Sequence, residues 1–332
     1  MVDKSFYNTS LSQAFSPCGN FLFVGNIYGE ITVFNLKKNL HVSSGEMCTR
    51  PTHKITCANQ ICALAASPTF LIAGSVGDIS GFHWNDVKFP KQENPRPAWT
   101  VQLPISRDTF CKADVNSIVL IKEDEGENGN FTSILAGCGD NKIHLFSLED
   151  GKLSRSFEGH DNYIHGISKC GSSVASASED GSVRLWDMRQ ATATAVVEPF
   201  QNERIARPAL GKWVGDVDLN EQWMLCGGGP RLSMWHIRTL SVGTVFMSSQ
   251  DKGIHVSKFI DDKVLGAGAS PCVSLLNYND KIRAEIETSQ ITVYSVAHQF
   301  EPRKVMSIAG SSPKIDLCTN FNYRDHVLSI KL

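Results

Sequence analysis

The sequence lacks the signals of several large protein classes. It contains no run of 18 apolar residues, so we expect no membrane-spanning helix. Its first residues, MVDKSFYNTSLSQ, have no apolar core, so we expect no secretory signal peptide. The 32 basic and 34 acidic residues leave a net charge of −2, which disfavours a general electrostatic attraction to nucleic acid or anionic lipid. Helix-period apolar patterns are also missing, which favours a β-rich fold.

The sequence also lacks the motifs of common catalytic and ligand sites. No GxSxG, HExxH or EF-hand pattern occurs. Gly227-Gly228-Gly229 resembles a phosphate-binding loop, but no Gly-Lys-Ser/Thr follows it, and a hairpin turn with positive φ explains it better. Histidines occur singly, as satisfied strand residues do, at His144, His165, His236 and His255. We therefore predict no enzyme activity, catalytic residue, cofactor, metal or small-molecule substrate.

The ten cysteines do not form a disulfide or zinc pattern. No CxxC pair occurs, and no Cys/His group has zinc-ligand spacing. Cys138, Cys226, Cys272 and Cys318 fall at repeat positions that favour small, half-buried side chains. We expect free thiols in a reducing compartment.

One stretch of the chain has a recognisable repeat pattern. Residues 159–189, GHDNYIHGISKCGSSVASASEDGSVRLWDMR, begin with Gly-His and end with Trp-Asp, as in a WD repeat of four strands. In such a unit the imidazole is held by the turn aspartate, a strand hydroxyl and the indole N–H. The four matching residues, which we call the polar tetrad, are His160, Ser176, Asp180 and Trp186. Their predicted role is structural.

The same pattern of an apolar strand, a short turn and an alternating strand recurs seven times. The turns follow Gly25, Gly74, Gly137, Ser176, Gly227, Gly268 and Gly310. We predict an all-β fold, a seven-bladed WD-repeat β-propeller that forms a single domain over residues 1–332. The last blade ends with a strand at 326–331, although residues 1–10 could add a strand there instead. The predicted blades cover approximately residues 11–58, 61–103, 114–157, 160–200, 212–248, 254–288 and 291–332.

Loops that join successive blades are the expected docking sites for other proteins. The long loop at 201–212 is the strongest candidate. Aromatic and arginine side chains provide most interface energy, although each could instead pack at the rim without touching a partner. The same side chains could bind single-stranded RNA, but the balanced charge disfavours direct RNA binding. The predicted partner-binding residues are Tyr28, Tyr163, Arg207, Trp213 and Arg231.

Several segments resemble one particular family. They are SPCGNFLFVGNIYGEITVFNL, GHDNYIHGIS, SEDGSVRLWDMR, GKWVGDVDLNEQWMLCGGGPRLSMWHIR and TNFNYRDHVLSIKL, and the sequence is similar to the THO complex subunit 6 family along nearly its whole length. The resemblance implies a nuclear, non-catalytic scaffold subunit of the THO complex within the transcription–export (TREX) machinery. It also implies docking of the coiled-coil THO subunits 5 and 7, and an indirect link to mRNA ribonucleoprotein in mRNA packaging and export.

A regulatory function is the alternative. Residues 186–189, Trp-Asp-Met-Arg, fit the WDxR pattern of WD-repeat substrate receptors that reach cullin ubiquitin ligases through a damage-binding adaptor protein. Arg189 could equally pair with a neighbouring turn. Co-purification distinguishes the two functions, because THO subunits are expected in one case and a cullin adaptor in the other.

The polar tetrad generates a first prediction. His160→Ala removes a buried hydrogen-bonding side chain and leaves its partners unsatisfied, at a cost of about 1–3 kcal/mol. The variant is expected to melt at a lower temperature than the wild-type chain in a thermal unfolding experiment. An unchanged melting temperature would contradict the structural role of His160.

Overall fold

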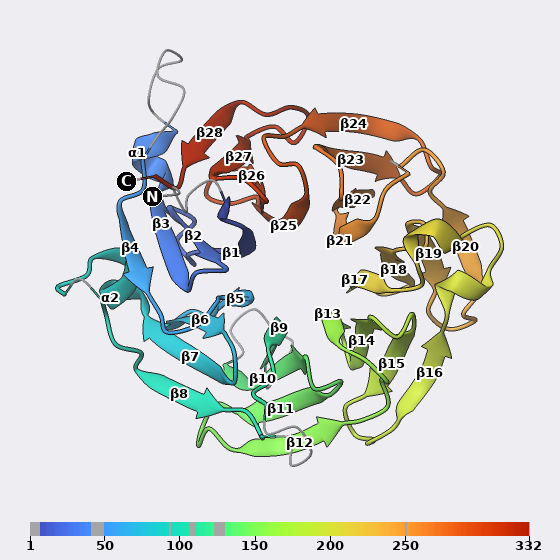
Figure 1. The fold of residues 1–332 in the computed structure, drawn as a ribbon, viewed down its shortest axis with the longest axis horizontal. Helices are drawn as coiled ribbons and strands as arrows, with labels where there is room; N and C mark the ends of the chain where they lie inside the picture. Colours follow the sequence, from blue (N-terminus) through green and yellow to red (C-terminus); the bar gives the residue numbers. More distant parts are fainter. Residues whose placement is uncertain are drawn as a thin grey trace. The chain divides into compact units, whose positions relative to one another are not determined.

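The chain folds into seven four-stranded antiparallel sheets, each made from strands consecutive in sequence. The computed structural model describes residues 7–40, 50–92, 94–105, 111–122, 130–249 and 251–331. Seven such sheets define a seven-bladed β-propeller (Figure 1), which confirms the predicted fold class. The chain divides into two compact units, residues 1–104 with 286–332, and residues 105–285. A single domain over the whole chain stays a prediction.

The first unit contains three sheets, and one of them is built from the C-terminal segment. The fourth strand of that sheet is β28. Residues 1–6, part of the segment named above as an alternative source of this strand, lie outside the described residues. The strands are β1 (Ser10–Phe15), β2 (Phe21–Asn26), β3 (Glu30–Asn35) and β4 (His53–Thr56); β5 (Ala63–Ala66), β6 (Phe70–Gly74), β7 (Asp78–His83) and β8 (Trp99–Gln102); and β25 (Val293–Gln299), β26 (Val305–Gly310), β27 (Lys314–Cys318) and β28 (His326–Ser329).

The second unit contributes the other four sheets, and β24 runs across its C-terminal boundary. The strands are β9 (Val115–Lys122), β10 (Phe131–Cys138), β11 (Ile143–Ser147) and β12 (Leu153–Phe157); β13 (Ile164–Cys170), β14 (Ser173–Ser178), β15 (Val183–Asp187) and β16 (Ala193–Val197); β17 (Val214–Leu219), β18 (Trp223–Gly228), β19 (Ser233–His236) and β20 (Val242–Val245); and β21 (Ile254–Ile260), β22 (Lys263–Gly268), β23 (Cys272–Asn277) and β24 (Ile282–Glu287).

Helical structure is confined to single turns among the described residues. These are α1 (Leu36–Asn39), α2 (Trp84–Lys88) and the 3₁₀ turns η2 (Pro199–Gln201) and η3 (Pro208–Leu210). Within the ranges given above, the helices are all too short to cross a membrane.

Burial along the strands follows their place in each sheet. Every residue of the second strand β2 is buried, whereas the outermost strand β24 alternates between buried and exposed residues. The difference arises because neighbouring sheets cover both faces of the middle strands, so side chains on both faces of these strands are buried. In the first unit, side chains of β2 and β3 contribute to apolar clusters that reach the other two sheets of the unit, β5–β8 and β25–β28.

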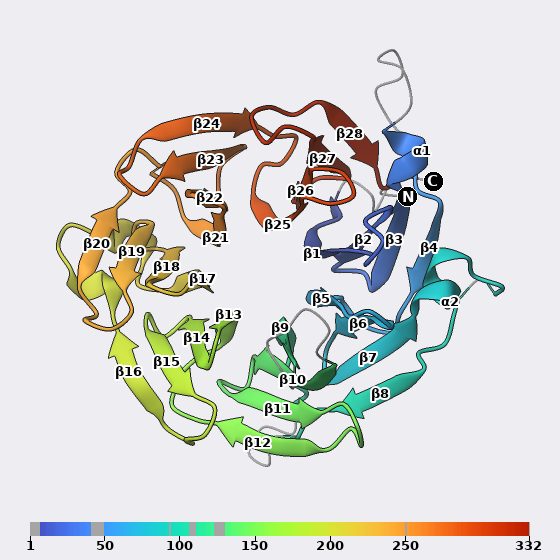
Figure 2. The same cartoon turned by 180° about the vertical axis from the view of Figure 1, so that it is seen from behind.

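Buried side chains join the first strands of neighbouring sheets. In the second unit, the Asp216 carboxylate on β17 accepts a hydrogen bond from the Ser257 N–H on β21 at 2.9 Å. In the first unit, the Gln13 amide on β1 donates to the carbonyl of Ser295 on β25 at 3.0 Å. Figure 2 shows β1 beside β25 and β17 beside β21 from the opposite side. Each sheet is therefore held to its neighbour within a unit by polar as well as apolar contacts.

Candidate docking face

The polar tetrad forms one hydrogen-bonded chain in the fourth sheet. His160 Nδ1 lies 2.7 Å from Asp180 Oδ2, and His160 Nε2 lies 2.7 Å from Ser176 Oγ. The Trp186 indole N–H donates to Ser176 Oγ at 2.8 Å, so the indole reaches the imidazole through the hydroxyl and not directly. His160, Ser176 and Trp186 are buried. The tetrad thus ties the segment before β13 to β14, β15 and the turn between them.

Asp180 is the charged member of this network. Burial alone would raise the pKa of its carboxyl, but hydrogen bonds from His160 and Ser182 outweigh burial and lower the pKa below its ordinary value. The carboxylate therefore stays ionised at neutral pH, where it accepts hydrogen bonds from both side chains.

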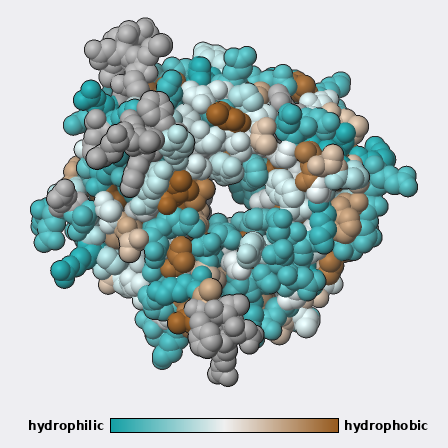
Figure 3. Space-filling model, in the orientation of Figure 1, coloured by the Kyte–Doolittle hydropathy of each residue, from teal (hydrophilic) through white to brown (hydrophobic). Residues whose placement is uncertain are grey.

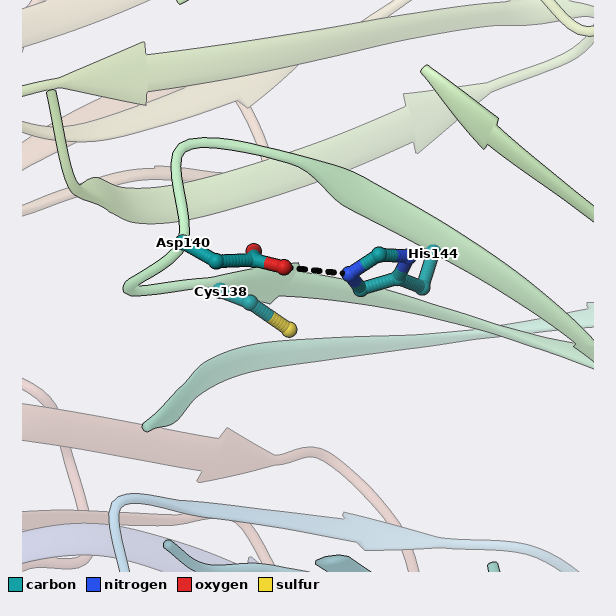
Figure 4. A group of neighbouring side chains, drawn as sticks. All are labelled: Cys138, Asp140 and His144. Atoms are coloured by element: carbon teal, nitrogen blue, oxygen red, sulfur yellow. Dashed lines mark hydrogen bonds and ion pairs between the residues drawn. The ribbon is translucent and has the colours of Figure 1, made fainter. Parts of the chain in front are cut away.

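A second polar group occupies the third sheet, and the sequence pattern did not reveal it. One atom from each of Cys138, Asp140 and His144 could coordinate a metal ion, and these three atoms lie within 4.8 Å of one another (Figure 4). His144 is buried, and its ring nitrogens lie 2.8 Å from Asp140 Oδ2 and 2.8 Å from Ser156 Oγ. Burial, reinforced by the nearby carboxylates, raises the pKa of the Cys138 thiol well above its usual range. The Cys138 thiol is therefore protonated, and the His144 imidazole is hydrogen-bonded through both nitrogens. These features suit a hydrogen-bond network that holds the β10–β11 turn.

Two of the predicted docking residues lie at the same end of neighbouring sheets. Tyr163 precedes β13 and Trp213 precedes β17, and these strands run side by side, with Ser168 Oγ donating to Asp218 at 2.8 Å. The Tyr163 side chain is 54% exposed, whereas Trp213 is half-buried. An exposed aromatic residue and an anchored one at the same end of neighbouring sheets suit a protein partner.

Trp213 is fixed by contacts on two sides. Its indole N–H donates to the Leu210 carbonyl at 2.9 Å, and its ring stacks on His255 with centroids 5.0 Å apart. Burial, with a smaller effect of His165, lowers the pKa of His255 to about 4. The imidazole in the stack is therefore neutral at physiological pH.

Arg207 is not presented to solvent. It is 8% exposed, and its guanidinium donates to the carbonyls of Gly228, Gly229 and Pro230 at 2.7–3.0 Å. These contacts favour rim packing over partner contact for this residue. Arg231 is more accessible, and both arginines contact the exposed Asp251, at 3.2 Å and 3.0 Å respectively.

The expectation of positive φ at the three glycines before Pro230 was wrong. Positive φ occurs at other described glycines, but not at Gly227, Gly228 or Gly229. Their role is close approach instead, because a Cβ at Gly228 would lie 2.1 Å from the Trp213 carbonyl oxygen. Two of their carbonyls face the Arg207 guanidinium, an arrangement that attracts a cation and not a phosphate.

Tyr28 belongs to the first unit, in the turn between β2 and β3, and its side chain is 41% exposed. Its hydroxyl lies 3.5 Å from the Tyr7 carbonyl oxygen. Figure 3 shows hydrophobic residues as separate patches among hydrophilic ones on the face in view. On that face the hydrophobic residues in view do not merge into one continuous apolar area.

Arg189, at the end of the WDxR pattern, forms an ion pair with Asp187, the last residue of β15. Its guanidinium contacts both oxygens of the Asp187 carboxylate, with Nη2 at 2.7 Å from Oδ2. The hydrogen bonds from Arg189 lower the pKa of Asp187 to about 2. The Arg189 side chain is nevertheless 84% exposed, so it remains accessible.

The fold and the polar tetrad define a WD-repeat β-propeller. The model of the family described as "WD domain, G-beta repeat" matches residues 151–187, which include the tetrad. The chain is 36% identical to THO complex subunit 6 of Drosophila melanogaster over 97% of this chain and 89% of that protein. It is 31% identical to THO complex subunit 6 of Homo sapiens over 98% of this chain and 94% of that protein.

The chain therefore belongs to the THO complex subunit 6 family. A shorter similarity, 28% identity, links it to DDB1- and CUL4-associated factor 13 of Xenopus tropicalis and covers 26% of this chain and 18% of that protein. The family and the WD-repeat fold agree with the resemblance seen in the sequence.

The lowered pKa of Asp180 generates a prediction about pH. A carboxyl whose pKa is lowered on folding stabilises the fold above its unfolded pKa, and this contribution disappears as the pH falls. Asp180→Asn is expected to be less stable than wild type at pH 7, by about 1–3 kcal/mol, with the difference shrinking below about pH 4. Urea unfolding as a function of pH measures this difference.

Asp161→Asn is the matched control, because Asp161 is exposed in the same blade. Its stability should follow that of wild type throughout. A stability difference between wild type and Asp180→Asn that does not change with pH would contradict an ionised Asp180 in the tetrad.

Proposed function

We propose that this chain is a non-catalytic scaffold subunit of a nuclear THO complex. In this role it docks coiled-coil THO subunits, including subunits 5 and 7, and acts in mRNA packaging and export. The observation that carries the proposal is the similarity to THO complex subunit 6 proteins along nearly the whole chain. Its contact with mRNA ribonucleoprotein is indirect, through the other subunits.

The polar groups of the blades support a scaffold without chemistry. Among the described histidines, the buried His144 and His160 have both ring nitrogens engaged within their own sheets. A general base needs a nitrogen free to accept a proton from a substrate. These contacts support a structural role for both histidines, in line with the proposed scaffold.

The docking face that we propose lies on the second unit and comprises Tyr163, Trp213 and Arg231. Tyr163 is the more exposed of the two aromatic residues, Trp213 is held rigid by its stack on His255, and Arg231 is partly exposed beside Asp251. Rigid aromatic rings and arginine lose little conformational entropy on binding, so they make effective anchors. Arg207 stabilises this face, because its guanidinium donates hydrogen bonds to carbonyls of the loop that carries Arg231.

A gentle affinity purification of the tagged chain, read by mass spectrometry, tests the proposal. The wild-type chain is expected to retain THO subunits, including subunits 5 and 7. The double variant Tyr163→Ala, Arg231→Ala should recover at least about tenfold less of these subunits than the wild-type chain. The reason is that anchor residues typically contribute about 2 kcal/mol or more to binding. Tyr323→Ala removes an equally exposed aromatic side chain from the β27–β28 loop and should recover wild-type amounts.

The ubiquitin-ligase alternative predicts a different result in the same experiment. The exposed Arg189 and the partial similarity to DDB1- and CUL4-associated factor 13 favour this alternative. It requires recovery of a cullin adaptor that Arg189→Ala abolishes. Recovery of the adaptor without THO subunits, or a tagged chain found outside the nucleus, would contradict the scaffold proposal.

A further inference from the structure

A cavity of ≈ 290 Å³ lies between the first two sheets of the first unit. One wall is formed by Thr56 and Cys57, at the end of β4, and another by side chains of β6 and β7. Pro95 and Pro97, from the segment that leads to β8, line it as well. In Figure 1 this segment passes beside β4, next to α2. The function proposed above does not use this cavity.

The proline-containing wall is fastened to the first sheet. The Thr56 N–H donates to Asn94 Oδ1 at 3.1 Å. The His53 side chain, on the same strand, contacts the Val87 carbonyl oxygen of α2 through Nε2 at 2.8 Å. These two hydrogen bonds hold β4 against α2 and against Asn94, which directly precedes Pro95. The cavity is therefore formed before any ligand arrives, which reduces the cost of binding.

One carboxylate supplies the charge of the cavity. Asp78 is the only charged side chain among the described lining residues, and it is half-buried. It accepts a hydrogen bond from Ser75 Oγ at 3.2 Å and forms no ion pair with any residue that the structure describes. Burial, with a smaller effect of the Asp78 carboxylate, raises the pKa of the Cys57 thiol, another lining residue, to about 11. An unpaired carboxylate in a partly buried cavity favours a cationic ligand.

The remaining lining suits a long side chain with a polar end. Ile61 and Phe82 provide apolar walls, and the hydroxyls of Ser80 and Thr100, 3.0 Å apart, provide further acceptors. The volume lies at the small end of ligand pockets, which span about 300–1,000 Å³, so it fits one side chain better than a cofactor. A guanidinium combines a planar apolar face with several donors and a fixed positive charge.

We propose that this cavity binds an arginine side chain from an extended segment of a partner protein. The guanidinium pairs with the Asp78 carboxylate, and the methylene groups lie against Ile61 and Phe82. The site is distinct from the proposed docking face, which uses residues of the second unit.

A peptide titration tests this inference on the full chain. The probe is acetyl-Gly-Arg-Gly-amide, and the matched neutral probe carries citrulline in place of arginine. Methyl NMR signals of Ile61 and Ala73, both in the cavity wall, report binding. The arginine peptide is expected to shift them with a dissociation constant of about 1 mM, and the citrulline peptide to bind at least about tenfold more weakly.

Three variants separate charge from shape. Asp78→Asn should reduce binding of the arginine peptide to the level of the citrulline peptide, whereas Asp86→Asn, at an exposed position on α2, should bind like wild type. Ala58→Phe fills the mouth of the cavity without changing its charge and should abolish binding. Unchanged unfolding temperatures confirm that each variant is folded.

Equal binding of the two peptides, no binding by either, or full binding by Asp78→Asn would each overturn the proposal. None of these outcomes bears on the docking face, because the peptide experiment leaves Tyr163, Trp213 and Arg231 unchanged.

Discussion

A four-stranded sheet cannot bury its own two faces, and this constraint governs the whole structure. Each sheet must be covered by its neighbours, and buried polar side chains on the first strands make that coverage specific. On β17, Asp216 and Asp218 accept hydrogen bonds from the N–H groups of Ser257 and Phe259 on β21, each at 2.9 Å. Burial raises the pKa of Asp216, although Lys258 and the Ser257 N–H oppose that effect. The first strands are thereby fixed to one another, which leaves the outer strands and the loops available for other proteins.

The repeat itself could be predicted from the sequence because its signals are local. The turn at Asp180 and Gly181, the alternating strand that ends at Trp186 and the Gly-His pair before β13 all lie within one blade. Hydrogen bonds inside that blade then connect the residues that the pattern singles out. Seven sheets follow from repetition of the same local rules.

The features that the sequence did not reveal depend on contacts between distant segments. Arg207 was predicted as a docking residue from its place in a long loop, yet it is buried against the carbonyls of a turn more than twenty residues away. Gly228 of that turn is required by the close approach of the Trp213 backbone, and Gly229 by that of the Gly211 backbone, which no local pattern encodes. The cavity around Asp78 likewise needs walls from two sheets.

These contacts divide the polar residues of the chain into two groups. One group, which includes His160, Asp180 and Asp216, is satisfied inside the sheets and maintains the fold. The other group, which includes Tyr163 and Arg231, lies at the loops with accessible surface. A scaffold requires both, because a docking surface keeps its shape only if the sheets beneath it do not move.

Hydrogen exchange of the folded chain tests most directly whether buried side chains join the first strands. The N–H groups of Ile167, Ser257 and Phe259 donate to side chains on the first strand of the neighbouring sheet. The account predicts that they exchange as slowly as the amides in the middle of β18 and β22, whereas unpaired amides on the outermost strands exchange rapidly. Rapid exchange at Ser257 and Phe259, at the rate of the outermost strands, would contradict it.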